Sequence, residues 1–64
     1  MTVVFIEIEL YQGNGSKVAL RADDIIVIRE MDGGTRIVMR SGGIFDTSMA
    51  YEEVKNLITT ACKD

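Results

Sequence analysis

The chain of 64 residues has no histidine, no proline and one cysteine, Cys62. A single cysteine excludes an intrachain disulfide, and without histidine the chain offers few of the ligands that structural zinc sites use. A nucleophilic cysteine needs a base and an orienting group, and none lies near Cys62 in the sequence. We therefore expect a protein that is not an enzyme and holds no metal or cofactor.

Long apolar runs and an excess of positive charge are also missing. No run approaches the roughly 20 residues of a membrane helix. Residues 1–10 contain two glutamates and no basic segment, so we expect no signal peptide there. The net charge of −3 argues against nonspecific nucleic-acid binding. With an unpaired thiol, these features predict a cytoplasmic location and neither a membrane nor a nucleic-acid partner.

The most informative stretch is 25–40, IIVIREMDGGTRIVMR. Two runs rich in Ile and Val flank Asp32-Gly33-Gly34, which predicts a hairpin whose two-residue turn is Asp32-Gly33 or Gly33-Gly34. The two registers differ by two residues and so assign the same faces. The predicted core face carries Ile26, Ile28, Ile37 and Met39, with Glu30 and Thr35 near the tip. The other face carries Ile25, Val27, Met31 and Val38 between Arg29, Arg36 and Arg40.

Alternating apolar residues predict a first hairpin, with strands over 3–11 and 17–21. A three-residue loop, Gly13-Asn14-Gly15, places Ile8 opposite Leu20, so that one face of the hairpin is apolar and the other is polar. The connector Ala22-Asp23-Asp24 is interpreted as a solvated turn rather than a metal-binding pair.

The C-terminal third predicts a turn, a short strand and a helix. Ser41-Gly42-Gly43 is expected to form a tight two-residue turn that puts Ile44 on the face of Met39 and Phe45 on the face of Val38. Thr47 and Ser48 are candidate helix N-caps. An apolar stripe at helical spacing follows them, formed by Ala50, Val54, Leu57, Ile58 and Ala61.

These elements predict one α+β domain over 1–64, a five-stranded antiparallel meander or small open barrel closed by a C-terminal amphipathic helix. The strands are expected over about 3–11, 17–21, 25–31, 35–40 and 44–46, and the helix over about 48–62. One helix covers only one face of a sheet. The other face would hold Val3, Phe5, Ile25, Val27, Val38 and Phe45. Such a patch in so small a chain predicts a homo-oligomer with Val3, Phe5, Ile25, Val27 and Val38 at its interface.

One constellation suggests a ligand. Arg29, Arg36 and Arg40 offer planar donor forks, Phe45 offers a ring for stacking, and Ser41, Gly42 and Gly43 offer backbone N–H groups. Together they predict a site for a small phosphorylated ligand, such as a nucleotide signal, between subunits. The alternative is that the arginines pair with Glu30, Asp32 or carboxylates of a neighbouring subunit.

The order of these segments resembles the short FlbD/SwrD-like proteins of bacteria and similar small phage proteins. The resemblance lies in the Asn14-Gly15 turn, Asp23-Asp24-Ile25-Ile26, Thr35-Arg36-Ile37-Val38-Met39-Arg40, Ser41-Gly42-Gly43 and Glu52-Glu53-Val54. The bacterial family implies a non-enzymatic flagellar accessory acting through protein contacts, and the phage relatives imply interference with the host. Two hypotheses follow: a phage sponge-like module that sequesters an anionic nucleotide, or a flagellar accessory protein.

Overall fold

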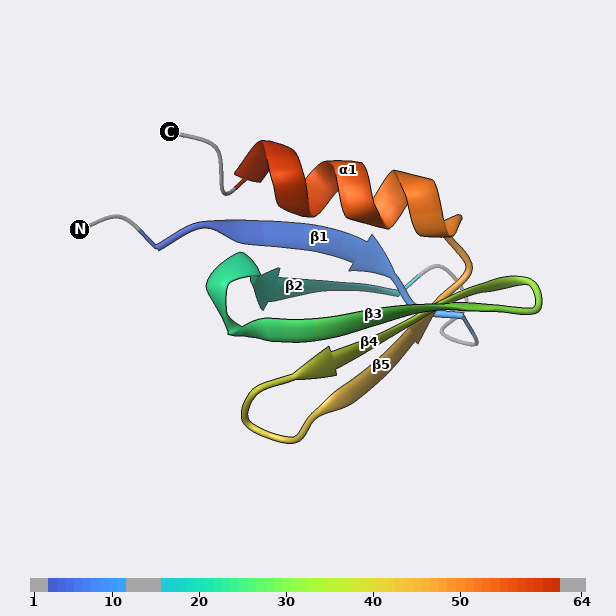
Figure 1. Ribbon diagram of the computed structural model, residues 1–64, viewed down its shortest axis with the longest axis horizontal. Helices are drawn as coiled ribbons and strands as arrows, with labels where there is room; N and C mark the ends of the chain where they lie inside the picture. Colours follow the sequence, from blue (N-terminus) through green and yellow to red (C-terminus); the bar gives the residue numbers. More distant parts are fainter. Residues whose placement is uncertain (1–2, 12–15, 62–64) are drawn as a thin grey trace.

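A computed structural model describes residues 3–11 and 16–61. The strands are β1 (Phe5–Glu9), β2 (Lys17–Arg21), β3 (Ile25–Met31), β4 (Gly34–Met39) and β5 (Ile44–Thr47). A 3₁₀ turn, η1 (Ala22–Asp24), joins β2 to β3, and the helix α1 (Tyr51–Ala61) ends the described chain. In Figure 1, α1 runs beside β1 while β3, β4 and β5 spread out below it. The predicted α+β class is confirmed.

The five strands form two antiparallel sheets, so the predicted meander holds within each sheet and is interrupted between β2 and β3. One contains β1 and β2, and the other has the order β3-β4-β5. The sheets meet just beyond the end of β1, where Tyr11 N–H donates to the Asp46 carbonyl at 2.9 Å and Leu10 forms a bridge with Thr47. Arg40 N–H donates to the Asp24 carbonyl at 2.6 Å and extends the β3–β4 pairing by one step. Within the described ranges the two sheets do not close into a barrel, because η1 separates β2 from β3.

The β3–β4 hairpin has the register of an Asp32-Gly33 turn. Arg29 lies opposite Arg36, and Gly33 has a φ of +86°, which glycine adopts without steric cost. This was one of the two predicted registers. Beyond it the pairing shifts by one residue between Ile25 and Val27, which is a β-bulge at Ile26.

The bulge reverses two predicted side-chain positions. Ile25 pairs with Met39 and packs against the core, whereas Ile26 is 54% exposed. The prediction of Ile26 as core and of Ile25 on the outward face was therefore wrong. The period-two argument failed here because an inserted residue changes the parity of everything beyond it.

The β1–β2 hairpin keeps its predicted faces in a different register. Ile6 lies opposite Leu20 and Ile8 opposite Val18, two residues away from the predicted pairing. The predicted three-residue loop is therefore wrong in register, although Gly13-Asn14-Gly15 itself lies outside the described residues. Because a shift of two preserves the faces, Ile6, Ile8 and Leu20 are buried as expected.

The β4–β5 turn has three residues in its loop instead of the predicted two, and this one-residue difference changes which faces the β5 side chains occupy. Its loop is Arg40-Ser41-Gly42, closed by Met39 N–H donating to the Gly43 carbonyl at 2.8 Å, with Gly42 at a φ of +103°. This is the three-residue hairpin geometry that requires glycine at its third position. It sets Val38 opposite Ile44 and Ile37 opposite Phe45. The faces predicted for Ile44 and Phe45 were therefore exchanged.

Helix α1 begins at Tyr51, later than the predicted residue 48, and neither Thr47 nor Ser48 is its N-cap. Thr47 instead ends β5. The helix contacts β1, β3 and β4, and its own residue Val54 is fully buried in the core. Leu57, Ile58 and Ala61 pack partly buried against the core, as the stripe predicted, whereas Ala50 is exposed.

The core of the described chain is small. Its buried apolar side chains are Ile6, Ile8, Leu20, Ala22, Ile37, Met39 and Val54. The chain presents 4583 Å² of accessible surface. No helix in residues 3–11 and 16–61 is long and apolar enough to cross a membrane.

Candidate functional site

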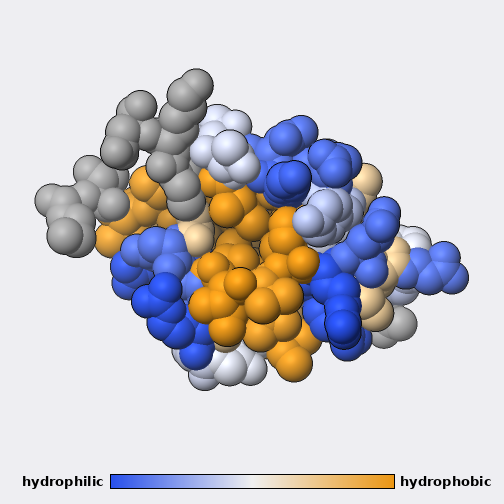
Figure 2. Space-filling model, in the orientation of Figure 1, coloured by the Kyte–Doolittle hydropathy of each residue, from blue (hydrophilic) through white to orange (hydrophobic). Residues whose placement is uncertain are grey.

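The candidate site is the face of β3-β4-β5 that points away from the core, here called the outer face. Its first row is apolar: Val27, Val38 and Ile44 lie side by side on the three strands. Val27 is 47% exposed and Ile44 is 60% exposed. Figure 2 shows apolar side chains gathered in the middle of the visible surface, over β3 to β5, with polar side chains to either side.

The second row of the outer face is charged. Arg29, Arg36 and Asp46 lie side by side in the same strand order. Arg36 binds Asp46 with two hydrogen bonds, Nε to Oδ1 at 2.9 Å and Nη2 to Oδ2 at 3.2 Å. These bonds hold the pKa of the Asp46 carboxyl below its usual range and raise the pKa of Arg36. Among the described residues, Arg29 has no carboxylate within 4.0 Å.

The outer face depends on three glycines. Gly33 and Gly42 close the two hairpins in the registers that align the rows. Gly34 permits a close approach, since a Cβ on it would lie 2.1 Å from the Thr47 carbonyl oxygen. A backbone oxygen cannot move aside like the end of a flexible side chain, so only glycine lets the start of β4 approach the end of β5 this closely.

The predicted ligand constellation is divided by the fold. Arg29 and Arg36 share the outer face, whereas Phe45 lies on the inner side and packs against the core. Arg40 follows β4 and reaches the Asp23 carbonyl with Nη2 at 3.5 Å, beside the predicted Ser41, Gly42 and Gly43. The prediction that Phe45 lies beside these arginines in one site was wrong. The three-residue turn puts Phe45 on the opposite face of the sheet from the one that a two-residue turn would give.

The alternative, that the arginines pair with carboxylates, describes Arg36, but its partner is Asp46 rather than the predicted Glu30 or Asp32. The other ion pair of the described chain is Arg21 with Asp23, at 2.9 Å. Asp23 and Asp24 lie in η1, and the described residues contain no group of three or more potential metal ligands.

The predicted interface residues are also divided. Val27 and Val38 belong to the outer face, Ile25 belongs to the core, and Val3 and Phe5 are exposed beside or within β1 on the other sheet. Sequence reasoning missed Ile44 and Asp46 on the outer face. The glycine at position 42 was the available signal, because a left-handed residue closing a three-residue loop would have corrected the parity.

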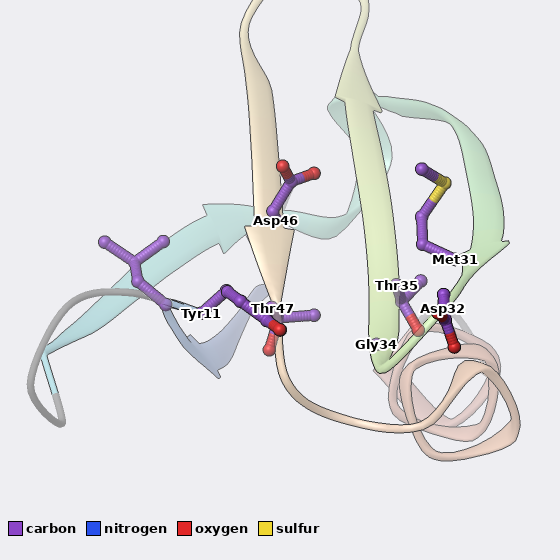
Figure 3. Close-up of a pocket in the computed structure, with 8 residues that line it drawn as sticks. Tyr11, Met31, Asp32, Gly34, Thr35, Asp46 and Thr47 are labelled. Atoms are coloured by element: carbon purple, nitrogen blue, oxygen red, sulfur yellow. The ribbon is translucent and has the colours of Figure 1, made fainter.

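A pocket of about 600 Å³ lies at the opposite end of the hairpin from Gly42. Figure 3 shows Tyr11 and Thr47 on one side of it and Met31 and Asp32 on the other. The hydroxyls of Thr35 and Thr47, which also line it, already donate to the carbonyls of Met49 and Glu9. The described part of the chain leaves no buried polar side-chain atom without a hydrogen-bond partner, and this includes the two threonine hydroxyls of the pocket.

No family model matches the chain, and no curated protein or solved structure matches it significantly.

Proposed function

We propose that this chain is a non-enzymatic binding module that self-associates, and that two copies meet through the outer face. The observation that carries the proposal is the apolar row Val27, Val38 and Ile44 beside a charged row on one open sheet face. Sheets with an apolar face normally bury it against another layer. Here α1 covers the inner side and leaves the outer face to a partner.

The small core supports a second copy as that partner. The described chain buries seven apolar residues, and chains of about this size often gain stability by oligomerisation.

Val27→Asp tests this proposal, and Val3→Asp is its matched control. Both valines are 47% exposed, but only Val27 lies on the outer face. Sedimentation velocity should show Val27→Asp as a folded monomer and Val3→Asp as the wild-type oligomer. If Val3→Asp dissociates the oligomer and Val27→Asp does not, the interface lies on the β1–β2 sheet instead.

A second candidate function is capture of a small anion, such as a nucleotide, at the charged row. The observation in its favour is that Arg29 and Arg36 lie opposite each other with one aspartate in their row, which leaves a net charge of +1. Like charges directly opposite are unfavourable, and a bound phosphate would relieve them. This is the sponge-like role that the phage resemblance suggests.

Calorimetry and thermal melts against linear and cyclic nucleotides test the second candidate. A ligand at 100 times its dissociation constant should stabilise the fold by about 2.7 kcal/mol. Arg36→Ala should abolish this shift, whereas Arg21→Ala, which removes the other paired arginine, should retain it. If no nucleotide shifts the wild-type melt, the flagellar-accessory role remains as the alternative, and the cytoplasmic location stays a prediction for either role.

A further inference from the structure

We propose that the two copies meet with a two-fold axis running along β4, so that Arg29 of each copy pairs with Asp46 of the other. This inference rests on the proposed self-association through the outer face. It assigns a partner to the one arginine of the charged row that has no carboxylate nearby within the described chain. Each site is incomplete in one copy and completed by the second.

The argument follows from the symmetry of two identical faces. When two copies of one sheet face pack together, the two-fold axis lies in the plane between them, and residue contacts are reciprocal. An axis along β4, the central strand, places β3 of one copy over β5 of the other. Val27 then lies over Ile44 and Val38 lies over Val38. In the charged row, Arg29 lies over Asp46, and Arg36, which is bonded to its own Asp46, lies over Arg36.

The packing of sheets leaves this pairing within reach. Aligned sheets pack about 10 Å apart and about 30° from parallel, with side chains of the two faces interdigitating. The charged row is the next outward-facing row after the apolar one, so it stays beside the packed centre. Arginine is long and planar and matches a carboxylate, which suits it to bridge such a gap.

An axis running across the strands through the apolar row gives a worse contact. It would lay the charged row of one copy over the side of the sheet where β4 continues into Arg40. Arg36 of one copy would then approach Arg40 of the other, and like charges across an interface are unfavourable. The along-strand axis also sets Arg36 over Arg36, but it adds two opposite-charge pairs, Arg29 with Asp46 in each direction, which the other axis does not.

Edge-to-edge pairing is the other way in which two copies of a sheet join. β3 is an edge strand of the three-stranded sheet, but it carries the bulge at Ile26. Bulges on edge strands twist the edge away and interrupt the ladder, and they are a common device against such pairing. The outer face therefore fits a second copy better than the β3 edge does.

A charge exchange between two variants tests the inference. One variant is Arg29→Glu, which keeps Asp46, and the other is Asp46→Lys, which keeps Arg29. Each variant alone would place two like-charged pairs across the interface, so its dissociation constant should rise by about tenfold or more. Mixed in equal amounts, they form two opposite-charge pairs, and the hetero-oligomer should regain nearly wild-type affinity. Native mass spectrometry separates the mixed species, because the variants differ in mass.

Arg21→Glu mixed with Asp23→Lys is the matched control. Arg21 and Asp23 are an exposed arginine and aspartate, as Arg29 and Asp46 are, but they pair within one chain and lie off the outer face. Each control variant should self-associate like the wild type, and mixing should change nothing. Recovery on mixing cannot come from misfolding, because an unfolded Asp46→Lys chain would not re-form the complex.

The results separate the inference from the proposal on which it rests. If the wild type associates and the Arg29→Glu and Asp46→Lys mixture shows no preference for the hetero-oligomer, self-association stands and the axis along β4 is refuted. The same holds if either variant alone associates as tightly as the wild type. If the wild type is monomeric at all concentrations, the proposed function itself fails.

Discussion

Replacement of Thr47 by valine tests the join between the two sheets. Thr47 ends β5, is 1% exposed and pairs with Leu10 beyond the end of β1. Its hydroxyl donates to the Glu9 carbonyl at 2.5 Å and accepts from Met49 N–H at 3.2 Å. The hydroxyl therefore ties β1 to β5 and to the segment that leads into α1.

Valine keeps the shape of threonine and removes only these two bonds. A buried backbone group that loses its partner costs about 1–3 kcal/mol, and the added methyl recovers about 0.8 kcal/mol at most. We expect a net loss of about 2 kcal/mol, which for a domain of this size lowers the melting temperature by roughly 8–16 °C.

The assay is thermal unfolding followed by circular dichroism. Thr35→Val, which removes one buried hydrogen bond to the Met49 carbonyl, should give a smaller loss. Thr60→Val on the exposed side of α1 is the surface control and should stay within about 0.5 kcal/mol of the wild type. A Thr47→Val melt that coincides with the Thr60→Val melt would refute the role assigned to the hydroxyl.

Three further predictions concern the core, the turns and pH. Ile37→Ala should cost about 2–5 kcal/mol in denaturant titrations, and Leu57→Ala should cost less because Leu57 is only partly buried; equal losses would contradict this core. Gly34→Ala should destabilise more than Gly42→Ala in thermal melts, since the first creates a backbone clash and the second only strains φ, and the reverse order would contradict it. The lowered pKa of Asp46 predicts stability that is present above its unfolded pKa of about 3.9 and is lost as pH falls through the lower folded value. Asp46→Asn should reduce this acid sensitivity, and an unchanged pH profile would argue against the pair.

The positions of most elements could be predicted from the sequence because local signals determine them. β2 and β3 coincide with the predicted ranges, and the Asp32-Gly33 turn is one of two predicted alternatives. The apolar stripe placed α1 correctly from Tyr51 onward. Its start was misplaced because Thr47 belongs to β5, and its hydroxyl donates one hydrogen bond to the Glu9 carbonyl. Glu9 lies far away in the sequence, so the local rules for helix caps do not reveal this bond.

The candidate site was harder to predict because its composition depends on parity. The bulge at Ile26 and the three-residue Arg40-Ser41-Gly42 loop each shift the alternation by one residue. The loop moved Ile44 onto the outer face and Phe45 off it, and it brought Asp46 beside Arg36. Composition and period alone do not reveal such single-residue shifts, whereas the pairing of whole strands does.

The most direct test of the central claim is sedimentation velocity of the unmodified protein across the micromolar range. A self-associating module should show a species of about twice the 7.1 kDa chain mass or larger, with a proportion that rises with concentration as mass action requires. A single 7.1 kDa species at every concentration would contradict the assignment of the outer face to a second copy.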